Sequence, residues 1–214
     1  ELGVRCQVAG PGKELPVQVK LIRQMPLLEV ELRMGDEIYP LLTGLVGAYN
    51  LQNILLAAAA GMYYDIPGAA IAKAISGYYP ENQRSQLVEG KKNRVVLDAY
   101  NANPSSMREA IGGLLSYATA PTMLILGDMA ELGESSEAEH RELLHWISGL
   151  EVDRILLAGP QFSRIGEPSA HLTVFRERKE LRAWLQREKP EGYHILLKGS
   201  RVMELETLLP LLVD

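Results

Sequence analysis

The chain has 214 residues, of which 47% are hydrophobic and 23% are charged, and its formal net charge is −5. This composition is typical of a soluble globular protein, and the length is sufficient for two domains. The negative charge disfavours nucleic acid or an anionic membrane as the main partner. No stretch approaches the roughly 18 uninterrupted apolar residues of a membrane helix, and the first residues lack signal-peptide features. The single cysteine, Cys6, excludes an intramolecular disulfide, so we expect a cytoplasmic protein.

Residues 1–46 show the pattern of β structure. Apolar and polar residues alternate with period two over 17–22 and 28–32, and residues 38–42 predict a partner strand. Pro40 should place that last strand at the edge of its sheet, because proline has no N–H to donate to a neighbouring strand.

Two helices are predicted after this β region. Residues 49–60 are strong helix formers, and Gly61 should close the helix. Asn50 and Asn53 lie one turn apart near its start, where propensity alone favours a capping role. A second helix is predicted over residues 68–75.

A domain boundary is predicted at residues 78–85, which are polar and aperiodic and should act as a hinge. We therefore divide the chain into 1–80 and 81–214. After the boundary, strands alternate with helices of about 10–15 residues, which predicts βαβ units and a mostly parallel sheet. Ser136 and Glu139 should form a capping box at the start of one of these helices. The segment Gly-Pro-Gly-Lys at 10–13 lacks the spacing of a phosphate-binding loop and predicts a turn.

The most informative stretch is 98–107, which connects a predicted buried strand over 94–97 to a predicted helix. Pro104 suits the first helical position and Asn103 the N-cap. Ligands of open α/β sheets bind at the carboxyl edge of the strands, so this junction is a candidate site. Turn and capping roles alone remain an alternative for Asp98 and Asn103. Four polar or aromatic groups stand there within six positions: Asp98, Tyr100, Asn101 and Asn103.

Two further strand ends carry similar groups. Asp128 follows the strand predicted over 122–126, and a Lys-Gly-Ser-Arg segment follows the one predicted over 193–197. Parallel strands deliver all three ends to one edge of the sheet. The G-x-G-x-x-G fingerprint is absent, which argues against a dehydrogenase. The candidate side chains of the Lys-Gly-Ser-Arg segment are Lys198, Ser200 and Arg201.

No catalytic residue and no metal site are predicted. The four histidines lack metal-ligand spacing, and no Ser-His-Asp or Cys-His arrangement can be assembled. His140 shares a helix face with Leu143, Leu144 and Ile147, which predicts a buried structural role.

Three motifs resemble, in order and spacing, those of the Mur ligases: Asp-Ala-Tyr-Asn-Ala-Asn-Pro-Ser-Ser-Met at 98–107, Gly-Asp-Met-Ala-Glu-Leu-Gly-Glu at 127–134 followed by His140, and Lys-Gly-Ser-Arg at 198–201. Gly-Ala-Tyr-Asn at 47–50 stands where the family usually has Gly-x-His-Asn. The similarity runs from about Gly44 to the C-terminus. The first two motifs are those of the branch that adds D-alanyl-D-alanine.

The resemblance implies part of an ATP-dependent, peptide-bond-forming ligase of peptidoglycan precursor synthesis. The family activates the carboxylate of a UDP-N-acetylmuramoyl peptide (a tripeptide in this branch) as an acyl phosphate, which the amine of D-Ala-D-Ala attacks. By position, Asn50 would contact adenine, Arg84 the nucleotide and Asp98 the ribose hydroxyls. We expect Asp98 to serve the nucleotide rather than fold stability, because Asn103 already caps the next helix. The residues at the dipeptide's entry would be Tyr100, Asn101, Asn103, Asp128, Lys198, Ser200 and Arg201.

In terms of fold, the resemblance implies a Rossmann-like C-terminal domain over 81–214. Residues 1–80 would be the end of the central ATP-binding domain, a partial α/β domain with a β-hairpin region. The family's phosphate loop and Mg²⁺ ligands would lie upstream, and the chain begins without methionine. We therefore expect the N-terminal and central-domain segments to be missing and the chain alone to be inactive. Two alternatives stay open: a folylpolyglutamate-synthase-like ligase, and a non-catalytic nucleotide- or peptide-binding module.

Overall fold

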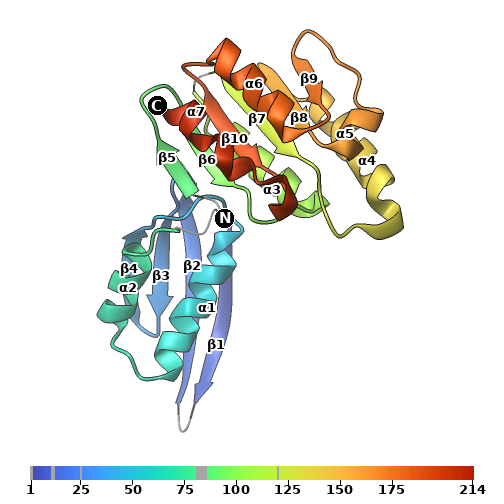
Figure 1. The fold of residues 1–214 in the computed structure, drawn as a ribbon. Helices are drawn as coiled ribbons and strands as arrows, with labels where there is room; N and C mark the ends of the chain where they lie inside the picture. Colours follow the sequence, from blue (N-terminus) through green and yellow to red (C-terminus); the bar gives the residue numbers. More distant parts are fainter. Residues whose placement is uncertain (1, 11–12, 25, 81–85, 120) are drawn as a thin grey trace. The chain divides into compact units, whose positions relative to one another are not determined.

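The computed structural model describes residues 2–10, 13–24, 26–80, 86–119 and 121–214, with backbone only for 7–10 and 13–15. It divides into two compact units, Glu1–Pro80 and Glu81–Asp214 (Figure 1), and each is described by itself. Arg84, most of the predicted hinge and the centre of the predicted Gly-Pro-Gly-Lys turn lie outside the described residues.

The first unit is an antiparallel sheet covered by two helices. The predicted strands are confirmed, and Pro40 lies on an edge strand opposite Glu31. The apolar residues of the inner sheet face, such as Val19 and Leu32, are fully buried against the helices. The strands, in their order across the sheet, are β1 (Gly3–Gly10), β2 (Lys13–Arg23), β3 (Glu29–Met34) and β4 (Glu37–Leu42).

The helices of this unit are α1 (Asn50–Tyr63) and α2 (Gly68–Ser76). The prediction that Gly61 closes α1 is wrong, because the helix continues to Tyr63. A side chain at Gly61 would place its Cβ 2.8 Å from the side chain of Ile71 on α2. Glycine is needed there for close helix packing and not for a left-handed cap.

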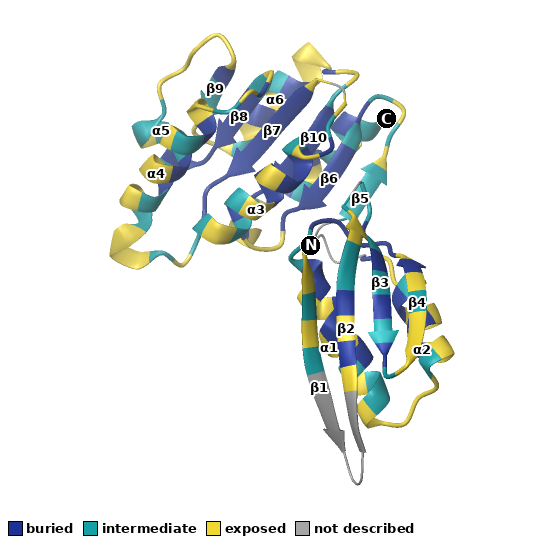
Figure 2. Ribbon diagram, turned by 180° about the vertical axis from the view of Figure 1, so that it is seen from behind, coloured by how far each residue is buried: buried dark blue, intermediate teal, exposed yellow. Residues whose placement is uncertain are grey.

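The second unit is a six-stranded sheet in the order β5-β6-β10-β7-β8-β9. Every neighbouring pair is parallel except β5 with β6, which confirms the predicted mostly parallel sheet. The central strands are buried on both faces (Figure 2). The strands are β5 (Gln86–Glu89), β6 (Arg94–Asp98), β7 (Thr122–Gly127), β8 (Arg154–Ala158), β9 (Leu172–Phe175) and β10 (His194–Lys198).

Helices cover both faces of this sheet, as continuous apolar strands require. On one face lie α3 (Pro104–Leu115), α4 (Ser136–Ser148) and α5 (Pro160–Ile165). On the other lie α6 (Arg178–Glu188), α7 (Leu209–Val213) and the 3-10 turns η2 (Arg201–Met203) and η3 (Leu205–Leu208). No helix in the described part of the chain has the length and apolarity needed to cross a bilayer.

The predicted capping box of Ser136 and Glu139 is wrong. A 3-10 turn, η1 (Gly133–Ser135), leads directly into α4, and the N-cap is Ser135, which makes no side-chain capping bond. Ser136 is already helical, so its hydroxyl is not placed to cap the following turn. Capping boxes are found instead at the start of α3, formed by Asn103 and Ser106, and at the start of α6, formed by Glu177 and Glu180.

Candidate functional site

The strand order brings three distant segments to one sheet edge. The connection from β6 to β7 skips one position, and β10, the last strand, fills it. Lys198 at the end of β10 is therefore in register with Asp98 on one side and with Leu126 on the other. The helices that follow β6 and β10 lie on opposite faces of the sheet, which makes this the switch point where α/β proteins bind ligands. The predicted convergence of the three strand ends is confirmed.

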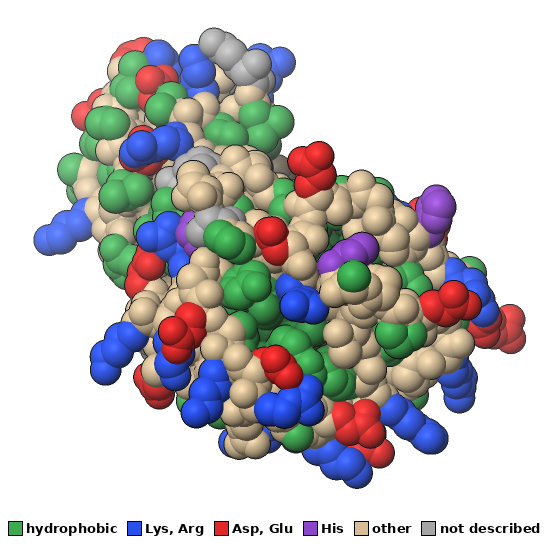
Figure 3. All heavy atoms as spheres, turned by 90° about the horizontal axis from the view of Figure 1, so that it is seen from above, with side chains coloured by type: hydrophobic (Ala, Val, Ile, Leu, Met, Phe, Trp, Pro, Cys, Tyr) green, Lys and Arg blue, Asp and Glu red, His purple; other side chains and the backbone are tan. Residues whose placement is uncertain are grey.

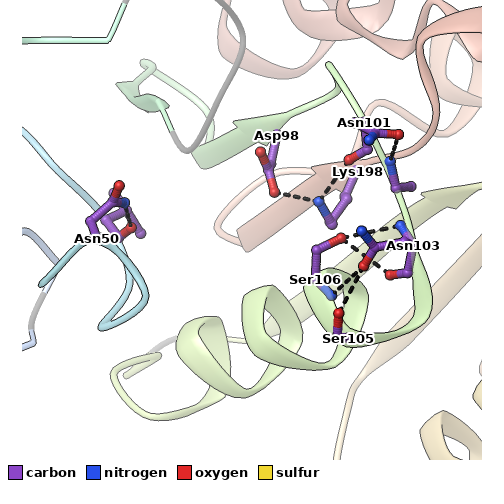
Figure 4. A network of polar contacts seen from close by, with 9 residues as sticks. Asn50, Asp98, Asn101, Asn103, Ser105, Ser106 and Lys198 are labelled. Atoms are coloured by element: carbon purple, nitrogen blue, oxygen red, sulfur yellow. Dashed lines mark hydrogen bonds and ion pairs between the residues drawn. The ribbon is translucent and has the colours of Figure 1, made fainter. Parts of the chain in front are cut away.

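At this edge Asp98 and Lys198 form a buried ion pair (Figure 4). The Nζ of Lys198 lies 2.5 Å from Oδ2 of Asp98 and also donates to the carbonyl oxygen of Asn101, at 3.1 Å. Only 1% of the Lys198 side chain and 13% of the Asp98 side chain are exposed. A buried charge needs a partner to offset its lost hydration. The sequence does not reveal this structural partner of Asp98, and its role toward the nucleotide stays a prediction.

The loop after β6 is ordered by its own amides. The side-chain oxygen of Asn101 accepts a hydrogen bond from the N–H of Ala102, at 2.8 Å. Asn103 is the N-cap of α3, as predicted, and its side-chain oxygen accepts from the N–H of Ser106, at 2.9 Å. Tyr100, in this loop, is 42% exposed. Asn101 and Asn103 are also exposed, so all three side chains are within reach of a ligand.

Asp128, after β7, has a structural task that the sequence does not reveal. Its buried carboxylate accepts hydrogen bonds from the N–H groups of Gln161, at 2.7 Å, and Phe162, at 3.0 Å, at the start of α5. Burial raises the pKa of Asp128, and these two hydrogen bonds oppose the rise. Gly159 has φ +133, and a Cβ there would lie 2.3 Å from Asp128 Cγ, so only glycine fits beside the carboxylate.

His140 is a buried structural residue, as predicted. Its Nε2 accepts a hydrogen bond from the N–H of Met129, at 3.0 Å, and its Nδ1 donates to the carbonyl oxygen of Ser136, at 2.7 Å. This network assigns the tautomer with the proton on Nδ1. Both ring nitrogens are occupied, so His140 orders the loop after β7 and is not placed as a base.

The loop from Lys198 to Arg201 packs closely against the end of β7. A Cβ at Gly199 would lie 3.1 Å from Cα of Gly127, so the two backbones touch. The N–H of Ser200 donates to the carbonyl oxygen of Asp128, and its buried Oγ has no partner within the described residues. Arg201 is 58% exposed and forms an ion pair with Glu206, at 3.2 Å. Ser200 is thus part of the loop's framework, and Arg201 faces solvent.

Asn50 lies in the first unit, near the start of α1. The prediction that Asn50 caps this helix is wrong, because the N-cap of α1 is Tyr49 and no side chain caps the helix. Instead, the buried Asn50 side chain donates to the carbonyl oxygen of Val46 and accepts from Asn53, both at 2.8 Å. The other predicted site residues that the structure describes, from Asp98 to Arg201, all belong to the second unit. The described residues contain no group of three or more His, Cys, Asp or Glu side chains that could hold a metal ion.

Residues 83–201, more than half of the chain, match the family described as Mur ligase, glutamate ligase domain. The chain therefore belongs to the Mur ligase family.

Among its curated relatives are two enzymes named UDP-N-acetylmuramoyl-tripeptide–D-alanyl-D-alanine ligase. The one from Bacillus subtilis is 33% identical over 180 residues, covering 79% of this chain and 39% of the relative. The one from Escherichia coli is 32% identical over 165 residues, covering 76% of this chain and 36% of the relative. The chain thus spans well under half the length of these curated relatives.

Solved structures give the same picture. A crystal structure of MurF from Acinetobacter baumannii matches with a TM-score of 0.76 at 26% identity, over 96% of this chain and 46% of that one. The MurF ligase from Thermotoga maritima in complex with ADP matches with a TM-score of 0.73 at 21% identity, over 91% and 45%. A folylpolyglutamate synthase from Thermotoga maritima has a TM-score of 0.65 at 15% identity, over 92% and 47%. The last two likenesses establish the fold alone.

Proposed function

We propose that this chain is part of an ATP-dependent ligase that adds D-Ala-D-Ala to UDP-N-acetylmuramoyl-tripeptide through an acyl phosphate. The observation that carries the proposal is the gathering of the motif side chains at one switch point, in a chain about one-third identical to enzymes of that name. The folylpolyglutamate synthase alternative is weaker, because its likeness is confined to the fold.

For the nucleotide we propose Asn50, Arg84 and Asp98. The Asp98 carboxylate lies at the switch point with part of its surface open, and a ribose diol can donate to such an oxygen. Its Oδ2 is oriented by Lys198, so the carboxylate is preorganised for a ligand. Bound ATP would supply the phosphoryl group that activates the acceptor carboxylate. We propose that Mg²⁺ accompanies ATP. The described residues contain no group that could hold a metal ion, so we propose that its ligands belong to the segments upstream of this chain.

For the dipeptide we propose two kinds of residue. Tyr100, Asn101, Asn103 and Arg201 are exposed and offer an aromatic face, amides and a guanidinium, which suit a peptide and its terminal carboxylate. The buried residues shape this surface from below. Lys198 holds the carbonyl of Asn101, and Asp128 with Ser200 joins the ends of β7 and β10. We infer that the buried residues Asp128, Lys198 and Ser200 position the exposed ones.

The partners we propose are small molecules in the cytoplasm, together with the N-terminal and central-domain segments of the same protein. Acidic and basic side chains are interspersed on the face shown in Figure 3, without the basic patch that nucleic acid or an anionic membrane would require. Phosphoryl transfer depends on positioning the metal and phosphates. The chain alone is therefore proposed to be inactive.

The test is a hybrid enzyme in which this chain replaces the matching residues of the Bacillus subtilis relative. With ATP, UDP-N-acetylmuramoyl-tripeptide and D-Ala-D-Ala, the hybrid should release phosphate, and omitting any one substrate should abolish the release. Replacing D-Ala-D-Ala by L-glutamate tests the folylpolyglutamate synthase alternative and should give no product.

Equilibrium binding to the 214-residue chain supplies the control. Turnover by the isolated chain would contradict the proposal that it is inactive without the other segments of the protein. A hybrid that folds and binds ATP and D-Ala-D-Ala without releasing phosphate would support the remaining alternative, a non-catalytic binding module.

A further inference from the structure

A hollow lies in the second unit, on the carboxyl side of β8 and β9, between α5 and the start of α6. Its volume is about 600 Å³, within the range of small-molecule pockets. Residues of α5, of the segment that follows it, of β9 and of the start of α6 line the hollow, and none of them is a predicted site residue. We call it the two-arginine hollow, after Arg164 and Arg176.

These two arginines differ from all the other arginines described in this unit. Neither guanidinium makes a hydrogen bond or ion pair with a described residue, and both line the same hollow. The remaining described arginines of the unit each bond a carboxylate or a backbone carbonyl: Arg94, Arg108, Arg141, Arg154, Arg178, Arg182, Arg187 and Arg201. Both side chains are exposed, so their guanidinium donors face solvent and are available to an anion that enters the pocket.

Glu180, the carboxylate in the lining, does not pair with the guanidinium group of Arg164 or of Arg176. Oε2 of Glu180 accepts hydrogen bonds from the N–H of Arg176, at 2.8 Å, and from the N–H of the N-cap residue Glu177, at 3.4 Å, the second of which belongs to the capping box of α6. Glu180 therefore fixes the backbone that carries Arg176. With two guanidinium groups and one carboxylate, the lining keeps an excess of positive charge, which favours an anion.

The floor of the hollow is apolar and tightly packed. A Cβ at Gly166 would lie 2.9 Å from Cγ2 of Val174, so this wall has no room for a larger residue. Pro160 and Pro168 add rigid apolar surface. A rigid apolar floor beneath two guanidinium groups suits a small molecule with an anionic group and a short apolar part.

The hollow borders the candidate site at Asp128, whose carboxylate accepts hydrogen bonds from α5 and feels the charge of Arg164, but it lies apart from Asp98 and Lys198. In the sheet order, β9 is three strands from β10, which at the usual strand spacing is about 14 Å. A dipeptide, which spans at most roughly 7 Å when extended, cannot reach from one to the other.

We propose that the two-arginine hollow binds a small molecule through a carboxylate or phosphate group, held by Arg164 and Arg176. The proposal does not rest on the proposed ligase function.

The test uses the 214-residue chain and two probes, inorganic phosphate and N-acetyl-D-alanine, followed by NMR. Binding should shift the amide signals of Ser163, Gly166 and Val174 and leave those of Tyr100 and Asn101 unchanged. Response to phosphate alone assigns a phosphate ligand, response to N-acetyl-D-alanine alone assigns a carboxylate, and response to both assigns the shared oxyanion chemistry.

Arg164→Gln and Arg176→Gln should each weaken binding at least tenfold, as loss of a charged hydrogen bond does. Arg187→Gln is the matched control, because Arg187 is an exposed arginine of α6 that pairs with its neighbour Glu188 and is not among the residues lining the hollow, and this variant should bind normally. Added NaCl should also weaken binding by the unaltered chain, which tests the site without a substitution. The proposal is overturned if neither probe binds, if the shifts map to residues 98–103, or if both arginine variants bind as the control does.

Discussion

Lys198 and Asp98, one hundred residues apart, are register partners on the parallel strands β10 and β6, and their side chains form an ion pair with Nζ 2.5 Å from Oδ2. The pair is almost fully buried. The same contact therefore joins the last strand to the centre of the sheet and orients the carboxylate proposed for the nucleotide. Under the proposed function, nucleotide binding and folding stability therefore depend on the same pair.

Asp98→Asn should lower the free energy of unfolding by about 3 kcal/mol, the low end of the cost of breaking a buried pair. The substitution leaves the Lys198 ammonium buried without an opposing charge, although the asparagine oxygen can still accept its hydrogen bond. Urea unfolding of the 214-residue chain measures the change. This is the reverse of what the sequence alone suggested, which was an unchanged stability.

The control for this prediction is the double variant Asp98→Asn with Lys198→Met. It removes both charges and fills the site with an apolar side chain of similar length, so it should regain part of the lost stability. Equal stability of the single variant and the unaltered chain would show that the pair does not contribute to folding.

Much of the second unit could be predicted from its sequence because its signals are local. The N-cap at Asn103 and proline at the first helical position mark one strand–helix junction within a few residues. The parallel sheet follows from the alternation of strands and helices. Pro40 likewise marked an edge strand through its own missing N–H.

What could not be predicted depends on contacts between distant residues. No local pattern shows that β10 inserts between β6 and β7, so the Lys198 partner of Asp98 could not be identified. Gly61 has the local pattern of a helix end, yet its packing against Ile71 is a tertiary contact. The two-arginine hollow has no sequence signal at all, because an arginine without a partner is visible only in three dimensions.

The observed capping role of Asn103 and its proposed contact with the dipeptide can be separated by substitution. Asn103→Ala removes the acceptor for the N–H of Ser106 and should cost about 1 kcal/mol of stability. Asn103→Asp keeps an acceptor at the N-cap and should preserve stability, while it replaces the amide proposed to contact the dipeptide.

Thermal unfolding and D-Ala-D-Ala saturation of the hybrid enzyme provide the two readouts for Asn103. We expect Asn103→Asp to raise the KM for D-Ala-D-Ala without lowering the melting temperature. If Asn103→Asp leaves both the KM for D-Ala-D-Ala and the melting temperature unchanged, the capping role is the one role left for Asn103.

Asp128 should behave as a structural residue for α5. Asp128→Ala removes the acceptor of the Gln161 and Phe162 N–H groups and should lower the free energy of unfolding by about 2 kcal/mol. Hydrogen exchange should become faster at these two amides and remain unchanged at Ser106, which Asn103 caps. Faster exchange at all three amides would indicate global destabilisation, and unchanged exchange at Gln161 would refute the assignment.

His194 should make stability depend on pH. It lies at the start of β10, only 8% exposed, beside the ring of Tyr117, and its Nδ1 has no partner within the described residues. Burial lowers the pKa of His194, and the positive charge of Arg94 lowers it further, while Glu89 opposes the shift. The folded chain therefore binds fewer protons than the unfolded chain between the lowered pKa and the ordinary value of about 6.5. The free energy of unfolding should rise with pH through that window and fall on acidification, by at most about 1.4 kcal/mol per pH unit from this residue.

His194→Gln removes the titrating group, so it should flatten that part of the pH dependence. Urea unfolding at pH 7.5 and at pH 5.5 measures it, and the difference between the variant and the unaltered chain cancels the contribution of all other groups. His145, exposed on α4, provides the matched control, since His145→Gln should leave the pH dependence of the unaltered chain in place. If the His194 variant loses as much stability on acidification as the His145 variant does, the proton is taken up elsewhere, and the buried imidazole is not the group that destabilises the fold in acid.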